Sequence, residues 1–129
     1  MNGFLFFLVA LVGAFVIFQW RMGAAAKRLQ GLDLPAADFS LPTHPDGAIL
    51  LFHHPRCGPC RDAMQQIELM EQAARSRVAT IDISEQFDFT QACGVRATPT
   101  LLFVQNGKII KAMIGPQSHK KLMALLGLH

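Results

Sequence analysis

Hydrophobic residues follow two patterns along the chain, and the first is a long apolar run near the N-terminus. Between Phe4 and Trp20 the only polar side chain is Gln19, so 17 successive positions are almost free of polar groups. This length lies at the lower limit for a helix that crosses a bilayer, and the residues up to Ala26 can extend it. Because the run has no polar face for water, it disfavours a core helix. We predict one transmembrane helix, with residues 1–26 as the membrane anchor.

A cleaved signal peptide is the main alternative for this run. The small residues Ala24-Ala25-Ala26 offer a cleavage site. However, no Lys or Arg precedes the apolar run, and Arg21 interrupts the approach to the alanines. We therefore favour a retained single-pass anchor.

The second pattern begins near residue 46, where short apolar segments alternate with segments of helical periodicity. The run Ala48–His53 is typical of a central strand covered on both faces, and Asn106-Gly107 is a strong hairpin signal. The pattern predicts strands at 48–53, 78–83, 100–105 and 108–114, and helices at 60–75, 85–92 and 118–126. This order predicts an α/β domain with a central mixed sheet flanked by helices.

Residues 27–45 separate the two patterns. They contain Gly31, Pro35, Pro42 and Pro45 and show weak periodicity. We interpret them as a linker and irregular lead-in, which leaves residues 46–129 for the α/β domain.

The charge of the chain adds information about orientation. The 129 residues contain 12 Lys and Arg against 9 Asp and Glu. Removing Arg21, Lys27 and Arg28, which follow the apolar run, leaves 9 of each sign (12 − 3 = 9). The domain is therefore near neutral, and we expect no nucleic-acid surface. The three basic residues favour an inner (cell) membrane protein with its domain in the cytoplasm; a periplasmic domain is the alternative.

The segment Arg56-Cys57-Gly58-Pro59-Cys60 carries the candidate chemistry. Two cysteines three positions apart, where a strand meets a helix, lie close enough for a disulfide. The helix N-terminus and a neighbouring cation favour the thiolate of Cys57, so we expect its pKa to lie below the usual value near 8.5. Gly58 permits the tight turn, and Pro59 begins the helix. The sequence therefore predicts reversible thiol–disulfide exchange.

Three further elements accompany this motif. They are Gly94-Val95-Arg96-Ala97-Thr98-Pro99-Thr100, the turn Asn106-Gly107-Lys108, and Gly115. With these elements the chain resembles the thioredoxin family from about Asp46 to Gly127, roughly two thirds of its length. The combination is much more specific than a lone Cys-x-x-Cys, because zinc sites use the same spacing.

The resemblance implies a thioredoxin-like fold and assigns roles to several residues. Cys57 would attack a substrate disulfide, and Cys60 would resolve the mixed disulfide. The Thr98–Pro99 peptide bond would be cis, and the backbone at Thr98 would hydrogen-bond to the bound substrate chain. Cys93 remains outside the pair, and we expect a small buried hydrophobic residue there.

The chain also departs from the family pattern. The buried acid of the family falls at Leu51, its buried lysine at Thr80, its tryptophan before the first cysteine at Arg56, and its helix-kinking proline at Gln65. The first strand and helix of the family fold are missing or shortened, since too few residues separate the linker from Ala48.

Without the buried acid, Cys60 needs another proton acceptor. His53 is a candidate, because residues 51 and 53 of a strand point to the same face. The alternative, which we favour slightly, is that His53 only packs there. A site for Zn²⁺ or Cu⁺ built from His53, His54, Cys57 and Cys60 is a minor alternative, because neighbouring strand residues point to opposite faces. We expect no metal.

These observations predict a membrane-tethered thiol–disulfide oxidoreductase that reduces protein disulfides. Its partners would be disulfide-bearing proteins and an electron donor that the sequence does not name. The sequence shows no flavin or nicotinamide motif, so we expect no cofactor. Two alternatives remain: a thioredoxin-fold binding module that does not turn over, and the same chemistry on the periplasmic side during envelope protein assembly.

Overall fold

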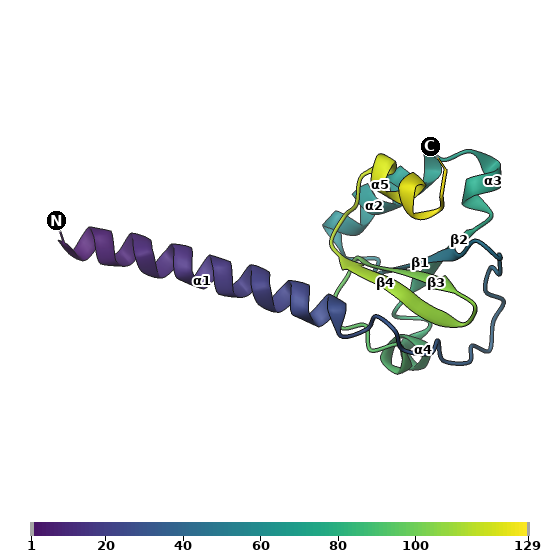
Figure 1. Ribbon diagram of the computed structural model, residues 1–129, viewed down its shortest axis with the longest axis horizontal. Coiled ribbons are helices and arrows are strands. Elements are labelled where there is room, and N and C mark those ends of the chain that lie inside the picture. Colours follow the sequence, from purple (N-terminus) through teal and green to yellow (C-terminus); the bar gives the residue numbers. More distant parts are fainter. Residues whose placement is uncertain (1, 129) are drawn as a thin grey trace.

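The computed structural model describes residues 2–128, and Figure 1 shows one long helix that leads into an α/β domain. The strands are β1 (Ala48–His53), β2 (Val78–Asp82), β3 (Thr100–Gln105) and β4 (Lys108–Ile114). The helices are α1 (Asn2–Lys27), α2 (Gly58–Glu68), α3 (Gln72–Arg75), α4 (Phe87–Ala92) and α5 (His119–Leu125). The prediction of an α/β fold with a central mixed sheet is confirmed.

The four strands form one sheet in the order β2-β1-β3-β4. β1 and β2 are parallel, whereas β3 is antiparallel to both β1 and β4. The turn between β3 and β4 has positive φ at Asn106 (54°) and Gly107 (76°), as a type I′ hairpin requires. A bulge interrupts the hairpin register between Phe103 and Val104.

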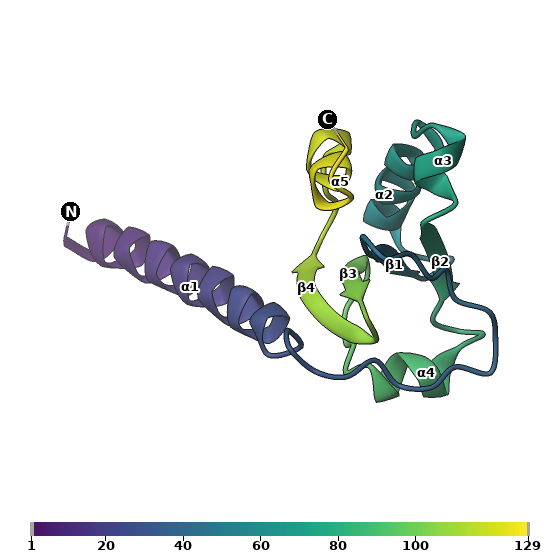
Figure 2. The ribbon, with the colours of Figure 1, turned by 45° about the vertical axis from the view of Figure 1, so that its right-hand side comes forward.

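Side chains of β1 enter the core on both faces of the sheet. Leu50 and Phe52 join a cluster on the face covered by α4, and Ile49 and Leu51 join a cluster on the other face. Figure 2 shows α2, α3 and α5 on this second face and α4 on the first. This burial on both faces explains why β1 is a continuous apolar run.

The prediction of one helix over residues 60–75 is wrong, because the helix breaks near Leu69. The N–H of Met70 donates to the carbonyl of Ile67 (3.0 Å), which tightens the last turn of α2. Glu71 is then extended (φ −64°, ψ 155°), and α3 begins after it. Residues 60–75 contain neither Gly nor Pro, so no local signal marked the break. The apolar stripe continues across it, because Met70 and Ala74 are both buried in one cluster.

Within residues 2–128, the chain between α1 and β1 forms no further helix or strand. It makes one isolated bridge, between Asp33 and Lys108 of β4. Farther along, the ring of Phe39 packs edge-on against Phe89 of α4, with ring centroids 5.1 Å apart. The segment that we expected to act as a linker thus lies along the domain and covers part of the core.

The helix α1 has 26 residues and is almost uniformly apolar up to Trp20. By length and composition it is able to cross a membrane, although signal sequences near an N-terminus share these properties. Its large apolar side chains from Phe4 to Trp20 are exposed. Figure 1 shows this part of α1 extending away from the domain.

Candidate functional site

A disulfide joins Cys57 and Cys60 where β1 leads into α2, and the two Cα atoms lie 5.3 Å apart. Cys57 is the N-cap of α2, and its Sγ accepts a hydrogen bond from the N–H of Cys60 (3.2 Å). Ser and Asp usually supply the acceptor at this position, so here a sulfur replaces the capping oxygen. Cys57 is half-buried, whereas Cys60 is only 2% exposed. The two sulfurs therefore differ in their access to a substrate.

A small cavity of about 360 Å³ opens beside the disulfide. Both cysteines line it together with His53, and Met64 of α2 adds an apolar wall. The other lining residues are His54, Pro55, Arg61, Gln65 and Glu68. The sequence-predicted histidine and the cysteine pair are thus brought to one site, whereas Arg56 is exposed next to Cys57 and does not line the cavity.

Both His53 and His54 line this cavity, although the sequence argument placed neighbouring strand residues on opposite faces. β1 ends at His53, so the strand alternation does not extend to His54. Instead, the Nδ1 of His54 accepts a hydrogen bond from the N–H of Arg56 (3.0 Å) and shapes the turn before the motif. Among residues 2–128, no group of three or more His, Cys, Asp or Glu side chains is placed to hold a metal ion.

The Thr98–Pro99 peptide bond is cis and precedes β3. Thr100 pairs with Phe52 of β1, which places this loop at the sheet edge where β1 ends. The carbonyl of Pro99 accepts a hydrogen bond from the N–H of Gly115 (2.8 Å). The hydroxyl of Thr100 donates to the carbonyl of Ala97 (2.6 Å). These bonds fix both ends of the loop. Sequence reasoning identified the loop but did not predict its contact with Gly115.

The two positions at which the family carries its buried charged pair are uncharged in this chain. Leu51, at the position of the family's buried acid, is 2% exposed and packs in one cluster with Ile67 and Met70. Thr80, at the position of the family's lysine, is exposed on β2. Neither position carries a carboxylate or a lysine, and the titratable side chains that line the cavity with the cysteines are His53, His54, Arg61 and Glu68.

Two ionisable groups near this region have shifted pKa values. The hydroxyl of Ser84 donates to Asp82 (2.5 Å) and lowers the pKa of that carboxyl below 3.8, with further help from the Ser84 N–H. Burial raises the pKa of the Cys93 thiol to about 12. Cys93 is therefore a neutral, buried thiol, as expected for a small core residue, and is no nucleophile at neutral pH.

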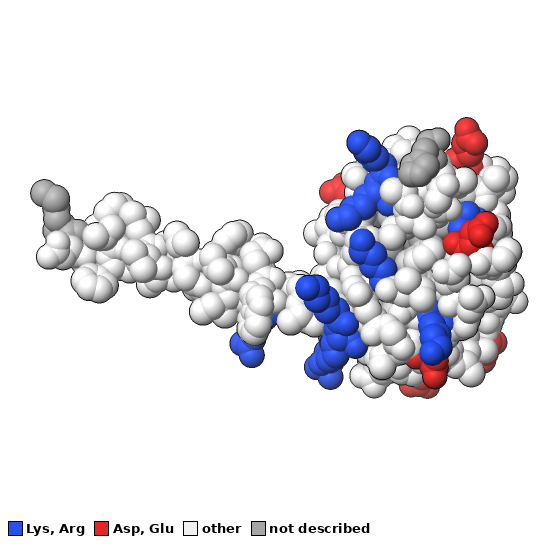
Figure 3. Space-filling model, in the orientation of Figure 1, with Lys and Arg blue, Asp and Glu red and all other residues white. Residues whose placement is uncertain are grey.

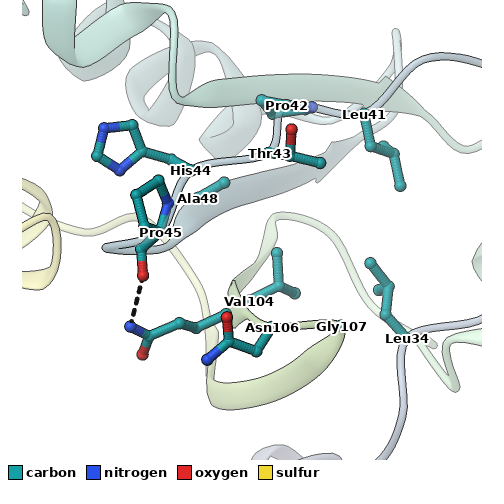
Figure 4. Close-up of a pocket in the computed structure, with 11 residues that line it drawn as sticks. Leu34, Leu41, Pro42, Thr43, His44, Pro45, Ala48, Val104, Asn106 and Gly107 are labelled. Atoms are coloured by element: carbon teal, nitrogen blue, oxygen red, sulfur yellow. Dashed lines mark hydrogen bonds between the residues drawn. The ribbon is translucent and has the colours of Figure 1, made fainter.

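A second cavity of about 390 Å³ lies at the opposite end of the sheet, near the β3–β4 turn. Figure 4 shows its lining, which includes Leu34, Pro45 and Val104. The side-chain amide of Gln105 donates to the carbonyl of Pro45 at its rim (2.9 Å). The lining is mostly apolar and contains no thiol, so this cavity adds nothing to disulfide exchange.

A mixed sheet, a Cys-x-x-Cys disulfide at the junction of β1 and α2, and a cis-proline before β3 together define the thioredoxin-like class of proteins. The family model described as Thioredoxin matches residues 40–127, well over half of the chain. The chain belongs to the thioredoxin family.

Individual relatives agree with this assignment. The chain is 37% identical over 87 residues to a thioredoxin H-type protein of Populus jackii, and the match covers 63% of each chain. It is 28% identical to the thioredoxin of Bacillus subtilis over 87 residues, which cover 65% of this chain and 84% of the relative. The chain thus matches slightly less than two thirds of the length of the plant relative.

Solved thioredoxin structures share the fold. The structure of Malassezia sympodialis thioredoxin has a TM-score of 0.56 at 27% identity, over 67% of this chain and 77% of that one. Mitochondrial thioredoxin 3 of Saccharomyces cerevisiae, in its oxidised form, has a TM-score of 0.56 at 25% identity over 67% and 82% of the two chains.

Proposed function

We propose that this protein is a thiol–disulfide oxidoreductase that reduces protein disulfides through the Cys57–Cys60 couple. The observation that carries this proposal is the position of Cys57 as the N-cap of α2, where its sulfur accepts the Cys60 N–H at 3.2 Å. After reduction, the same N–H and the helix dipole stabilise a thiolate at Cys57. A thiolate that a substrate can reach is the attacking form in disulfide exchange.

The reaction then runs in two exchanges. The Cys57 thiolate attacks one sulfur of the substrate disulfide, so that a mixed disulfide forms and the other substrate sulfur leaves as a thiolate. The buried Cys60 thiol loses its proton and attacks the Sγ of Cys57. The Cys57–Cys60 disulfide forms, and the substrate leaves with two thiols. Two electrons pass from the protein to the substrate, and an external dithiol donor must restore them.

His53 is the proposed proton acceptor for Cys60. Its imidazole lines the same cavity as both cysteines, and an imidazole is a common general base in proteins. The competing proposal is that His53 only packs against α2. The two predict different pH dependence for the second exchange, because only a base that titrates would slow resolution at acidic pH.

The residues around the cysteine pair and in the cis-proline loop have supporting roles. We assign the backbone at Thr98, held by the cis-Pro99 loop, to bind the substrate chain by strand addition. Exposed Arg56 supports the thiolate as a neighbouring cation, while Gly58 and Pro59 form the first turn of α2.

We also propose that α1 anchors the protein in the inner membrane, with the domain on the cytoplasmic side. Support comes from the exposed apolar surface of α1 and its ability to cross a bilayer. The basic residues Arg21, Lys27 and Arg28 follow the apolar run and favour retention on the cytoplasmic side.

The proposal is tested with the full chain in mild detergent, by following insulin reduction with dithiothreitol. We expect the protein to accelerate the reaction, and Cys57→Ser and Cys60→Ser to abolish the acceleration. Cys93→Ser is the matched control and keeps it, because Cys93 is buried and its pKa is about 12. If the unaltered protein gives no acceleration and its Cys57 alkylates slowly, the protein is instead a binding module.

The role of His53 is tested by resolution of a preformed mixed disulfide on Cys57. We expect His53→Phe to slow resolution at neutral pH and to change its pH profile, because the variant lacks the proposed general base. An unchanged pH profile would assign His53 to packing alone.

A further inference from the structure

The C-terminal end of α1 belongs to the folded domain. Ala26 and Leu29 are only 7% and 4% exposed, and they lie in one core cluster with Ile109 and Ala112 of β4. A Cβ on Gly94 would lie 2.8 Å from the Cδ2 of Leu29. Leu29 therefore packs against the start of the loop that carries the cis-proline.

Backbone hydrogen bonds then fasten the next residues to the edge of the sheet. The N–H of Gly31 donates to the carbonyl of Ile109 (2.7 Å), and the N–H of Ile109 donates to the carbonyl of Leu32 (2.8 Å). The N–H of Leu34 donates to the carbonyl of Gly107 (2.8 Å). The end of α1, the turn after it and the segment bonded to β4 follow one another directly along the chain. No flexible linker therefore separates α1 from the domain.

These bonds also fix the direction in which α1 leaves. The segment from Gly31 to Leu34 runs antiparallel to β4, toward the hairpin turn. α1 therefore approaches from the other end of the sheet, where β4 finishes at Ile114. Figures 1 and 2 both show α1 extending outward on that side of the domain.

Cys57, Cys60 and the cis-Pro99 loop lie at this same end of the sheet, where β1 and β4 finish. We call this end the active-site edge. Thr100, which follows the cis-proline, pairs with Phe52 near the end of β1 and with Ile114 at the end of β4. Cys57 follows β1 at this edge. The disulfide and the substrate-binding loop thus face the direction from which α1 arrives.

The number of residues between Arg21 and the domain gives an approximate distance from the lipid headgroups to the active-site edge. Lys27, the last residue of α1, lies six positions after Arg21, so a helical rise of about 1.5 Å per residue places the domain edge about 9 Å beyond Arg21. A strand of six residues, such as β1, spans roughly 20 Å. If Arg21 lies at the headgroups, the active-site edge is about 10 Å from them, and the hairpin end is roughly 20 Å farther away.

The charges agree with this placement. Arg56 and Arg96 are exposed beside the two active-site loops, and Lys27 and Arg28 are exposed at the end of α1. Figure 3 shows Lys and Arg side chains gathered over the half of the domain nearer α1. Anionic lipid headgroups attract these exposed cations.

We propose that the active-site edge faces the bilayer and that the substrates are membrane proteins whose disulfide lies at the membrane surface, on the same side as the domain. This inference rests on the proposed function, namely anchoring by α1 and disulfide reduction by Cys57 and Cys60. In the exchange, the Cys57 thiolate attacks a substrate sulfur close to the headgroups. Closure of Cys57–Cys60 then delivers two electrons and leaves two substrate thiols.

The first experiment measures depth in vesicles that contain anionic lipid. A fluorophore is placed on Cys57 in a Cys60→Ser chain, or on Thr43→Cys in a chain with Cys57→Ser and Cys60→Ser. Thr43 is exposed and lines the cavity at the hairpin end, and Cys93 is buried. We expect a quencher attached to lipid headgroups to quench the label at Cys57 much more strongly. Equal quenching, or stronger quenching at residue 43, would overturn the proposed orientation.

The second experiment measures substrate choice in the same vesicles. Single-span peptides carry a cystine loop either at the membrane surface or on a helical spacer of about 20 residues, which raises it by about 30 Å. With dithiothreitol as the electron donor, we expect the full chain to reduce the near loop at least about tenfold faster than the far loop. A flexible Gly-Ser insertion of about 20 residues between Gly23 and Ala24 should bring the two rates within about twofold, because it frees the domain.

The outcomes separate this inference from the proposed function. A water-soluble aromatic disulfide added to the same vesicles reports disulfide reduction alone. If it is reduced but the near and far loops react equally in the unaltered chain, the orientation is wrong and the oxidoreductase remains. If it is not reduced, or if the chain does not stay with the vesicles, the proposed function fails and this inference fails with it.

Discussion

At the scale of a single residue, Arg77 holds three parts of the chain together. It is 7% exposed, and its guanidinium donates to the carbonyls of Gly47, Leu126 and Asp46, each at 3.0 Å. These carbonyls belong to the turn before β1 and to the end of α5. The buried cation therefore connects the start of the central strand with the C-terminal helix.

We expect Arg77→Met to destabilise the domain by about 2–4 kcal/mol, because it leaves buried carbonyl groups without donors. Urea unfolding of the full chain in detergent, followed by circular dichroism, measures the change. Arg75→Met is the matched control: Arg75 is exposed and its guanidinium donates to the side chain of Gln72 (2.9 Å), so the effect should stay within about 0.5 kcal/mol. Equal losses from the two variants would refute this role for Arg77.

Asp82 gives a second prediction at this scale, on pH dependence. The hydrogen bonds from Ser84 lower the pKa of Asp82 below 3.8, so the fold favours the carboxylate. The resulting stabilisation is present above pH 3.8 and is lost as the pH falls through the lowered pKa of the folded state. We expect Ser84→Ala to raise the pKa of Asp82 toward 3.8, as measured by NMR titration of its carboxyl carbon.

The control for this titration is Ser76→Ala. The hydroxyl of Ser76 donates to the backbone carbonyl of Ala73 (2.7 Å) and not to a carboxylate. It should leave the titration of Asp82 unchanged. A shift of the same size in both variants would mean that the Ser84 hydroxyl is not the cause.

At the scale of the elements, the strands were the most predictable part of the sequence. The bounds of β1 matched because Ala48–His53 is apolar at nearly every position and is buried on both faces. The β3–β4 hairpin matched because Asn106-Gly107 can adopt the two positive φ angles that the turn requires. These signals are local, so one sequence was enough to read them.

Features that depend on tertiary contacts were not predicted. The break between α2 and α3 has no Gly or Pro, and the segment of residues 31–34 that bonds to β4 is too short to give a strand pattern on its own. The arrangement of the candidate site was also only partly predictable from the sequence. The motif located Cys57 and Cys60, but the turn after His53 that brings His54 into the cavity lies beyond the strand pattern.

The α2–α3 break leads to a prediction at the element scale. Glu71 is the N-cap of α3, and its side chain makes no capping hydrogen bond. Serine at this position can accept an N–H of the first turn, so we expect Glu71→Ser to stabilise the domain by about 0.5–1 kcal/mol in urea unfolding. Ala73→Ser lies within α3 and is exposed, so this control should bring no gain. A gain in both variants would argue against capping.

At the scale of the whole molecule, the N-terminal region supplies part of the hydrophobic core of the domain. The end of α1 and the lead-in pack Leu29, Phe39 and Leu41 on the face of the sheet that α4 covers. The apolar length of α1 before this junction is left exposed. One segment therefore supplies core contacts at one end and a candidate membrane helix at the other, so the orientation of the domain and its fold are coupled.

The proposed cytoplasmic location of the domain rests on the three basic residues Arg21, Lys27 and Arg28, and it can be tested on the intact chain. We expect a C-terminal fusion to green fluorescent protein to fluoresce and one to alkaline phosphatase to stay inactive, because the positive flank is retained in the cytoplasm.

Replacing Arg21, Lys27 and Arg28 by Ser should weaken this bias, since all three side chains are exposed and their loss leaves the packing intact. Replacing the exposed Lys108, Lys120 and Lys121 of the domain is the matched control and should leave the ratio unchanged. An active phosphatase fusion of the unaltered chain would place Cys57 on the periplasmic side, where the same exchange would act on envelope proteins.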